Sequence, residues 1–308
     1  MPSVLGIAPT KRSKTHMLEI QVDCQTPDSL SAGLCALLSR WGEHVPYECI
    51  AGLSGASFSP ALRRQETCAS CWMDVGSDAR LEFLGNALGF SVEALPQPLT
   101  PEQARRVACQ ALKAGDGVLV ASQHGWTLLP EWPVRLDPQP PDAMRLYILR
   151  PATRYLSRCE ALRDALRHAS QVANGYCAED GVAYGGELYA AWQERLGWDA
   201  FCPECGNHDW LCAERTARRA QHGQRAAARF LNRAAALLPR WSEDAALLMA
   251  ENAYNAMARK LTPYTAPGAI AGWWHDRAAR ARFEADVAEV ADLHVHAALS
   301  LACLACRL

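Results

Sequence analysis

The residues best suited to chemistry gather near the start of the chain, where a predicted helix begins. Cys24, Asp28 and Ser29 precede or open a run with helical spacing that ends at Gly42. A side chain at a helix N-terminus lies at the positive end of the helix dipole, beside backbone N–H groups without helical partners. A thiolate or an oxyanion is stabilised there. The spacing therefore favours a nucleophile at Ser29. Cys24 is the alternative: it lies further from the helix, but a thiol is a better nucleophile than a hydroxyl.

A serine nucleophile requires a general base, because its hydroxyl is far more basic than a thiol. His124 follows a strand-like run and is the best candidate base, and Asp137, or less well Asp142, could orient it. A structural interpretation competes with this one. Asp28 or Ser29 can simply cap the helix, a role that both residue types favour, and His124 would then be a polar loop residue. We rank capping ahead of catalysis, since motif matches of this kind often arise without function.

The thirteen cysteines include three pairs with CxxC spacing. The pairs are Cys68/Cys71, Cys202/Cys205 and Cys303/Cys306. The sharpest is Cys202-Pro-Glu-Cys205, because a knuckle of this kind turns both sulfurs toward one point, and His208 or Cys212 could complete a tetrahedral zinc site. Structural thiols without a metal are the competing interpretation for this pair.

Two patterns near the C-terminus indicate structural roles. Cys303 and Cys306 lie beside apolar residues on a predicted helix, which favours buried thiols. His294 and His296 are two residues apart, so on a helix they point to different faces and do not share a metal. His294 continues the apolar face of the helix, so we expect a partly buried histidine with its hydrogen bonds satisfied.

Composition limits the classes of partner. The chain has 308 residues, of which half are hydrophobic, and its net charge of −2 gives no electrostatic reason to expect nucleic acid or an anionic membrane. No uninterrupted run approaches the roughly 18 apolar residues of a spanning helix. The first twelve residues place their basic residues after the apolar ones, the wrong order for a signal peptide. We therefore expect a cytoplasmic protein with reduced thiols and no membrane partner.

The spacing of apolar residues divides the chain near residue 152. The first part mixes helices with strands, and the second part is helical almost throughout. The predicted helices cover 29–41, 78–88, 100–114, 155–170, 186–196, 211–238, 242–261 and 278–306, and the predicted strands cover 117–122, 125–129 and 144–149. Residues 52–60, rich in Gly and Ser, read as a loop. The short connection at 150–153 predicts that the two halves pack together, with Trp192 or the Trp273-Trp274 pair at the contact.

Several segments resemble a known group of enzymes. They are residues 28–42, 52–58, 88–92, 117–120 and 186–196. Together they resemble papain-like and bacteriocin-processing peptidases, in particular bacterial proteins related to the amino-terminal domain of butirosin biosynthesis protein H. The resemblance implies a papain-like domain followed by a helical domain, with Ser29 at the position of the nucleophilic cysteine and Gln21 or Gln25 donating to the oxyanion. The chain departs from the family in having no cysteine at that position.

The sequence therefore predicts an α+β protein, with a papain-like, cysteine-peptidase-like α/β domain in residues 1–152 and an all-helical domain in 153–308 packed on it. We expect a catalytically degenerate relative that binds a peptide-like or small-molecule ligand in the old cleft. The first alternative is an acyltransferase or amide hydrolase with Ser29 or Cys24 as nucleophile and His124 as base. The second is a binding module stabilised by zinc, the one candidate cofactor. The oligomeric state does not follow from the sequence.

Overall fold

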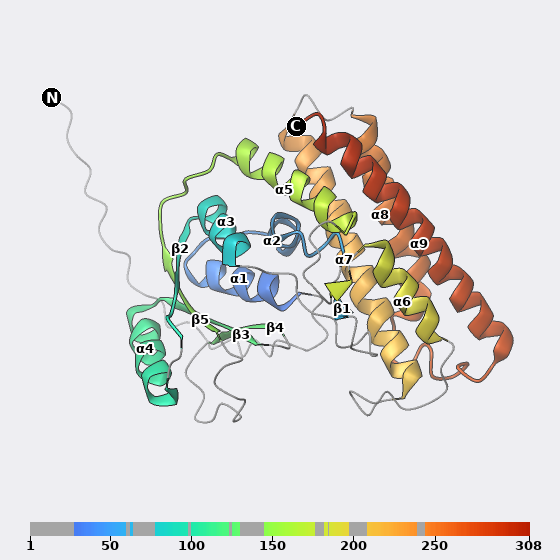
Figure 1. The fold of residues 1–308 in the computed structure, drawn as a ribbon, viewed down its shortest axis with the longest axis horizontal. Helices are drawn as coiled ribbons and strands as arrows, with labels where there is room; N and C mark the ends of the chain where they lie inside the picture. Colours follow the sequence, from blue (N-terminus) through green and yellow to red (C-terminus); the bar gives the residue numbers. More distant parts are fainter. Residues whose placement is uncertain are drawn as a thin grey trace.

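A computed structural model describes most of the chain (Figure 1). The described residues are 28–59, 62–63, 78–97, 100–122, 125–129, 145–175, 182–183, 185–196, 208–238 and 244–308. Within these residues the protein is mixed, with many helices and a small antiparallel sheet, which confirms the α+β class in its general form.

The sheet contains the strands β2 (Phe90–Ala94), β3 (Gly117–Ser122), β4 (Gly125–Leu129) and β5 (Arg145–Pro151). Their order is β2-β5-β3-β4 and all neighbours are antiparallel. The three strands predicted from β-branched and apolar runs correspond to β3, β4 and β5. A separate two-stranded pair joins β1 (Leu62–Arg63) to β6 (Val182–Ala183).

The two faces of the sheet are covered by different helices, because side chains alternate along each strand. Leu119 of β3 and Tyr147 of β5 pack in the main core with α1 (Ser29–Arg40) and α3 (Asp78–Leu88). Val118 and Ile148, one position away on the same strands, pack against the alanine face of α4 (Pro101–Ala114). The helix α1 is thus buried between the sheet and the rest of the molecule (Figure 1).

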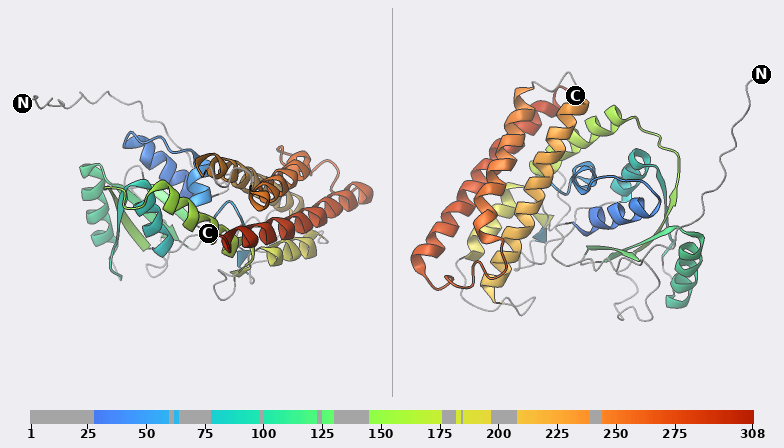
Figure 2. Two further views of the ribbon diagram at one scale, coloured as in Figure 1. Left: turned by 90° about the horizontal axis from the view of Figure 1, so that it is seen from above. Right: turned by 180° about the vertical axis from the view of Figure 1, so that it is seen from behind.

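The second half is mostly a stack of helices, but the prediction that it is all-helical is wrong at β6, which pairs with β1 of the first half. It contains α5 (Arg158–Ala173), α6 (Gly186–Leu196), α7 (Asp209–Leu237), α8 (Ala245–Leu261), the short 3-10 helix η4 (Thr262–Tyr264) and α9 (Arg277–Ala305). Helix α8 lies between α7 and α9, and α9 lies on the outer side, away from the sheet (Figure 1 and Figure 2).

The two halves meet at a helix that the sequence analysis missed, α2 (Tyr47–Ser54). The prediction of a loop at 52–60 is therefore wrong for its first three residues, which form the last turn of α2. A Cβ atom at Gly52 would lie under 3.0 Å from three atoms of Phe230 on α7, so only glycine lets the two helices come this close. Phe58, just after α2, packs edge-on against Phe230 and Tyr254. One buried cluster therefore continues from the α/β half into the helical half.

The ring contacts of the predicted tryptophans, among the described residues, lie within the helical half. Trp192 packs against Phe283, Trp273 packs against Tyr264 and Phe283, and all of these residues belong to the helical half. Trp126 packs against Tyr147 within the α/β half. The side chains of Phe58, Phe230 and Tyr254 form the contact between the two halves that we had predicted for tryptophan.

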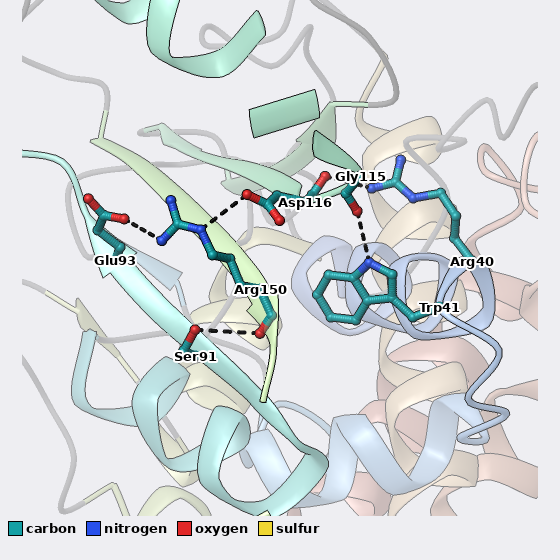
Figure 3. Close-up of polar contacts among 7 residues, drawn as sticks. All are labelled: Arg40, Trp41, Ser91, Glu93, Gly115, Asp116 and Arg150. Carbon is teal, nitrogen blue, oxygen red and sulfur yellow. Dashed lines mark hydrogen bonds and ion pairs between the residues drawn. The ribbon is translucent and has the colours of Figure 1, made fainter. Parts of the chain in front are cut away.

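The far end of α1 is fixed by polar contacts to the turn between α4 and β3 (Figure 3). The indole N–H of Trp41 donates to the carbonyl oxygen of Gly115 at 3.1 Å, and Arg40 donates to the carbonyl oxygen of Asp116 at 3.0 Å. Arg150 on β5 bridges the Asp116 carboxylate and Glu93 on β2. These contacts hold α1 in register with the sheet, so that its opposite end lies at the start of β4.

Candidate functional site

The N-terminal end of α1 is capped by a buried carboxylate. Asp28 adopts an extended backbone, is 3% exposed and accepts hydrogen bonds from the backbone N–H of Ser31, at 3.2 Å, and from the Ser31 hydroxyl. An aspartate in this position satisfies a backbone donor of the first turn and places negative charge at the positive end of the helix dipole. The capping role that we ranked first is therefore what Asp28 performs.

Ser29 is the first residue of α1, and its hydroxyl reaches the sheet. Its Oγ accepts a hydrogen bond from the backbone N–H of Trp126 at 2.8 Å. In an antiparallel ladder, alternate residues direct their backbone groups away from the partner strand, and Trp126, opposite Ala121, directs its N–H to α1. β4 is the last strand at this side of the described sheet, so the Ser29 hydroxyl covers part of a sheet edge.

Close packing of α1 on β4 makes this contact possible. A Cβ atom at Gly33, one turn after Ser29, would lie 3.2 Å from the Cβ of Leu128. The small residue lets the helix approach the strand until the Ser29 oxygen reaches the Trp126 amide. For a catalytically silent chain we expected this hydroxyl to bond only to local backbone, and that expectation is wrong, because its partner lies 97 positions away.

A buried polar chain leads from Asp28 into the molecule. The Ser31 hydroxyl lies 3.5 Å from that of Ser54, at the end of α2, and both residues are fully buried. Ser54 donates to the carbonyl oxygen of Ala51 at 3.0 Å and accepts from the backbone N–H of Ala56 at 3.3 Å. The Ser31 hydroxyl is satisfied by the Asp28 carboxylate and the Ser54 hydroxyl by nearby backbone, which is the usual arrangement for buried polar groups.

Arg80 on α3 and His168 on α5 close the end of α2, and sequence reasoning missed both. Arg80 is 8% exposed, donates to the Leu53 carbonyl oxygen and forms an ion pair with Asp164 at 2.9 Å. Burial, and then the positive charge of Arg80, lowers the pKa of His168 to about 4, although Asp164 opposes the shift. The sequence indicates these two residues only by their positions. Both interrupt the apolar face of a helix, where a charged or titratable side chain needs a partner.

The other predicted catalytic residues lie outside the described residues. These are Gln21, Cys24, Gln25, His124, Asp137 and Asp142. The structure therefore brings Ser29 to the beginning of β4, the strand that His124 immediately precedes in the sequence. It does not describe the base, the residue that would orient it, or the oxyanion donors.

The predicted zinc ligands are divided in the same way. Cys202 and Cys205 lie outside the described residues, whereas His208 and Cys212 lie at the start of α7. They are four residues apart, so they share one side of the helix. His208 stacks on Trp210, and Cys212 is buried. Among the described residues no three His, Cys, Asp or Glu side chains are placed to hold a metal, so zinc stays a prediction.

The two structural predictions for α9 have different outcomes. His294 is 1% exposed, more deeply buried than predicted, and its Nε2 lies 3.0 Å from the carbonyl oxygen of Ala173. The prediction that its hydrogen bonds are satisfied holds only for Nε2, because Nδ1 has no partner among the described residues. Burial lowers the pKa of His294 to about 4, even though the Ala173 carbonyl opposes the shift. The prediction of buried thiols is wrong, because Cys303 and Cys306 are both exposed. They follow apolar neighbours on the outer side of the helix and not on its buried side.

Comparison with family models and with curated proteins identifies no relative of the chain. No protein-family model matches the chain, and no match to it is found among curated proteins. The resemblance to the papain-like enzymes therefore enters below as part of a proposal, beside the geometry at Ser29.

Proposed function

We propose that this chain is a catalytically silent relative of the papain-like peptidases that binds a peptide-like or small-molecule ligand at the N-terminal end of α1. The proposal rests on one observation: the Ser29 oxygen accepts the Trp126 amide proton, so the hydroxyl at the nucleophile position joins a helix to a strand. The ligand class follows from the resemblance, since relatives of this fold act on amides and thioesters. Composition supports a cytoplasmic protein without nucleic-acid or membrane partners.

The charge at this end of α1 supports the same conclusion. Acyl transfer develops negative charge on the oxygen of the reacting carbonyl, and enzymes place hydrogen-bond donors there. The Asp28 carboxylate is buried beside Ser29 and accepts a hydrogen bond from the backbone N–H of Ser31. A fixed negative charge at this point opposes a second one and reduces the advantage that a helix N-terminus gives to an oxyanion.

An acyltransferase or amide hydrolase is the alternative function. The hydrogen bond between Ser29 and Trp126 is compatible with it for a different reason. Trp126 is two residues after His124, so the bond to Ser29 fixes a nearby point of the chain beside the hydroxyl. A catalytic site would need His124 within about 2.6–3.2 Å of the nucleophile in the presence of substrate. In that case Asp28 would serve only to hold the helix.

Covalent labelling of the full chain separates the two functions. We expect a fluorophosphonate to leave Ser29 unmodified, and a thiol reagent to modify Cys24 no faster in the native than in the denatured protein, as read by peptide mass spectrometry. Peptide-like amides should raise the melting temperature, because a ligand of the folded state adds stability by mass action. Native-specific labelling of Ser29 that disappears in His124→Ala would establish the acyl-transfer alternative. A melting temperature unchanged by any amide or thioester would refute the binding function.

A further inference from the structure

Helix α9 has two apolar seams, and the fold uses one of them. The inner seam is buried against α5, α6 and α8. Its members are Phe283, Val287, Val290, His294, Ala297, Leu301 and Leu304, at alternating intervals of four and three residues. This is the spacing with which one helix packs against another.

The outer seam has the same spacing and faces away from the molecule. It consists of Asp292, Val295, Leu299, Ala302 and Cys306, at intervals of three, four, three and four residues. Val295 is 49% exposed and Leu299 is 56% exposed, and Cys306 is exposed as well. A second seam with helix-packing spacing indicates a second helical partner, which the folded chain does not supply.

Helix α8 carries two further exposed apolar side chains in its first turns. Ion pairs between Arg307 and Asp244, at 2.8 Å, and between Lys260 and Asp286, at 3.2 Å, set α8 antiparallel to α9. The first turns of α8 therefore lie beside the last turns of α9. Leu248 and Met249 are exposed there. Leu237, at the end of α7, is exposed as well.

The two seams explain another property of α9. It is long and apolar enough to cross a membrane by length and composition, and it is the one helix in the described residues of which this is true. In this fold 44% of its most apolar window is buried, and the apolar residues that remain are those of the outer seam and its neighbours. The composition of α9 is thus that of a helix that packs on two sides.

We propose that the outer seam binds the α9 helix of a second copy of this chain, in antiparallel orientation, about a two-fold axis near Leu299. Charge selects this orientation. Asp292 at one end of the seam has no ion-pair partner among the described residues, and Arg307 lies just beyond the other end, 54% exposed. An antiparallel pair brings Asp292 of each copy toward Arg307 of the other, whereas a parallel pair would place the two Asp292 carboxylates together.

The same axis makes the contact self-complementary. Val295 and Cys303 lie four residues on either side of Leu299, so each packs against the other in the second copy, and Leu299 lies close to its own equivalent. From Asp292 to Cys306 the seam is about 21 Å long, at 1.5 Å per residue. An interface of this length lies at the small end of specific contacts, so the dimer dissociates on dilution.

Sedimentation of the full chain tests the dimer. We expect the average mass to rise from monomer toward dimer as the protein is concentrated, and Leu299→Glu to keep it monomeric. Tyr155→Glu is the matched control, because Tyr155 is the exposed large side chain that lies away from this surface, and it should leave the dimer unchanged. A wild-type monomer at every concentration, or a Leu299→Glu protein that still dimerises, would overturn the proposal.

A charge exchange tests the orientation. Asp292→Arg and Arg307→Glu should each weaken the dimer, and the double variant should restore it, because the opposite charges meet again with their places exchanged. Both Arg307→Glu and the double variant lose the internal pair with Asp244, so that loss cannot explain a recovery. A double variant weaker than either single one would exclude the antiparallel pair. Binding of a monomeric chain to phosphatidylcholine vesicles, lost in Leu299→Glu, would assign the surface to a membrane instead.

Discussion

Replacing Gly52 by alanine should lower the free energy of unfolding by about 3 kcal/mol, the upper part of the range for an overpacked core. The new Cβ would lie under 3.0 Å from the Cβ, Cγ and Cδ2 atoms of Phe230. Phe230 is 2% exposed and is held edge-on against Phe58, so it has little room to move. The gain in helix propensity from glycine to alanine, about 1 kcal/mol, opposes the effect without reversing it. Denaturant unfolding of both proteins measures the difference.

Two further variants show whether the contact between α2 and α7 is the cause. Gly272→Ala is the matched control, because a Cβ atom there has nothing within 4 Å and its φ is not positive, so stability should change little. Phe230→Ala destabilises by itself, yet Gly52→Ala should cost less in its presence than in the wild type, because the overlapping Cγ and Cδ2 atoms are gone. Equal costs in the two backgrounds would mean that α2 and α7 do not meet as described.

Acidification from pH 7 to pH 4 should remove about 3 kcal/mol of stability through His294 alone. Its pKa is about 4 in the folded protein and about 6.5 when unfolded, and each unit is worth about 1.4 kcal/mol. Above pH 6.5 the residue is neutral in both states and imposes no cost. Below pH 6.5 the imidazole is protonated in the unfolded chain but stays neutral in the folded protein. The free energy of unfolding therefore falls until the pH reaches about 4. Denaturant unfolding at a series of pH values measures this slope.

A variant at position 294 isolates the effect. His294→Gln does not titrate, and its side-chain amide can still donate to the Ala173 carbonyl oxygen, so its stability should depend less on pH between 6.5 and 4. The slope that remains should come largely from His168, whose pKa is lowered in the same direction. If His294→Gln and the wild type lose stability in parallel over this range, His294 is not buried in neutral form.

Local chemistry made some elements predictable from the sequence. Thr100, Pro101 and Gln103 predict the start of α4, and both hydrogen bonds of the capping box are present, while Gly115 ends the helix in a left-handed conformation. The strands at β3 and β4 were predicted equally well, because runs such as 117–122 carry β-branched and apolar side chains without competing helical spacing. Each of these features depends on residues within a few positions of one another.

The features that were predicted wrongly depend on contacts between residues that are distant in the sequence. Gly52 reads as a loop residue because the sequence does not show Phe230 against it, and that contact is what makes glycine suitable inside α2. Cys306 belongs to the outer seam and Cys303 lies beside it. The helical spacing of this seam resembles that of a buried one, so spacing alone could not tell which side faces the core. At the candidate site the sequence identified Ser29 and its capping alternative, but the partner, the Trp126 amide, follows only from the packing of α1 on β4.

The central claim is that the Ser29 hydroxyl has a structural role: it accepts a hydrogen bond from the backbone N–H of Trp126 and so joins α1 to β4. Hydrogen exchange at that amide tests it most directly, with the amides of β3 as a reference for overall stability. We predict a protected Trp126 amide in the wild type, a loss of protection of about tenfold in Ser29→Ala, the equivalent of one hydrogen bond, and retained protection in Ser29→Thr. An unprotected Trp126 amide in the wild type, or equal protection in Ser29→Ala, would contradict the account.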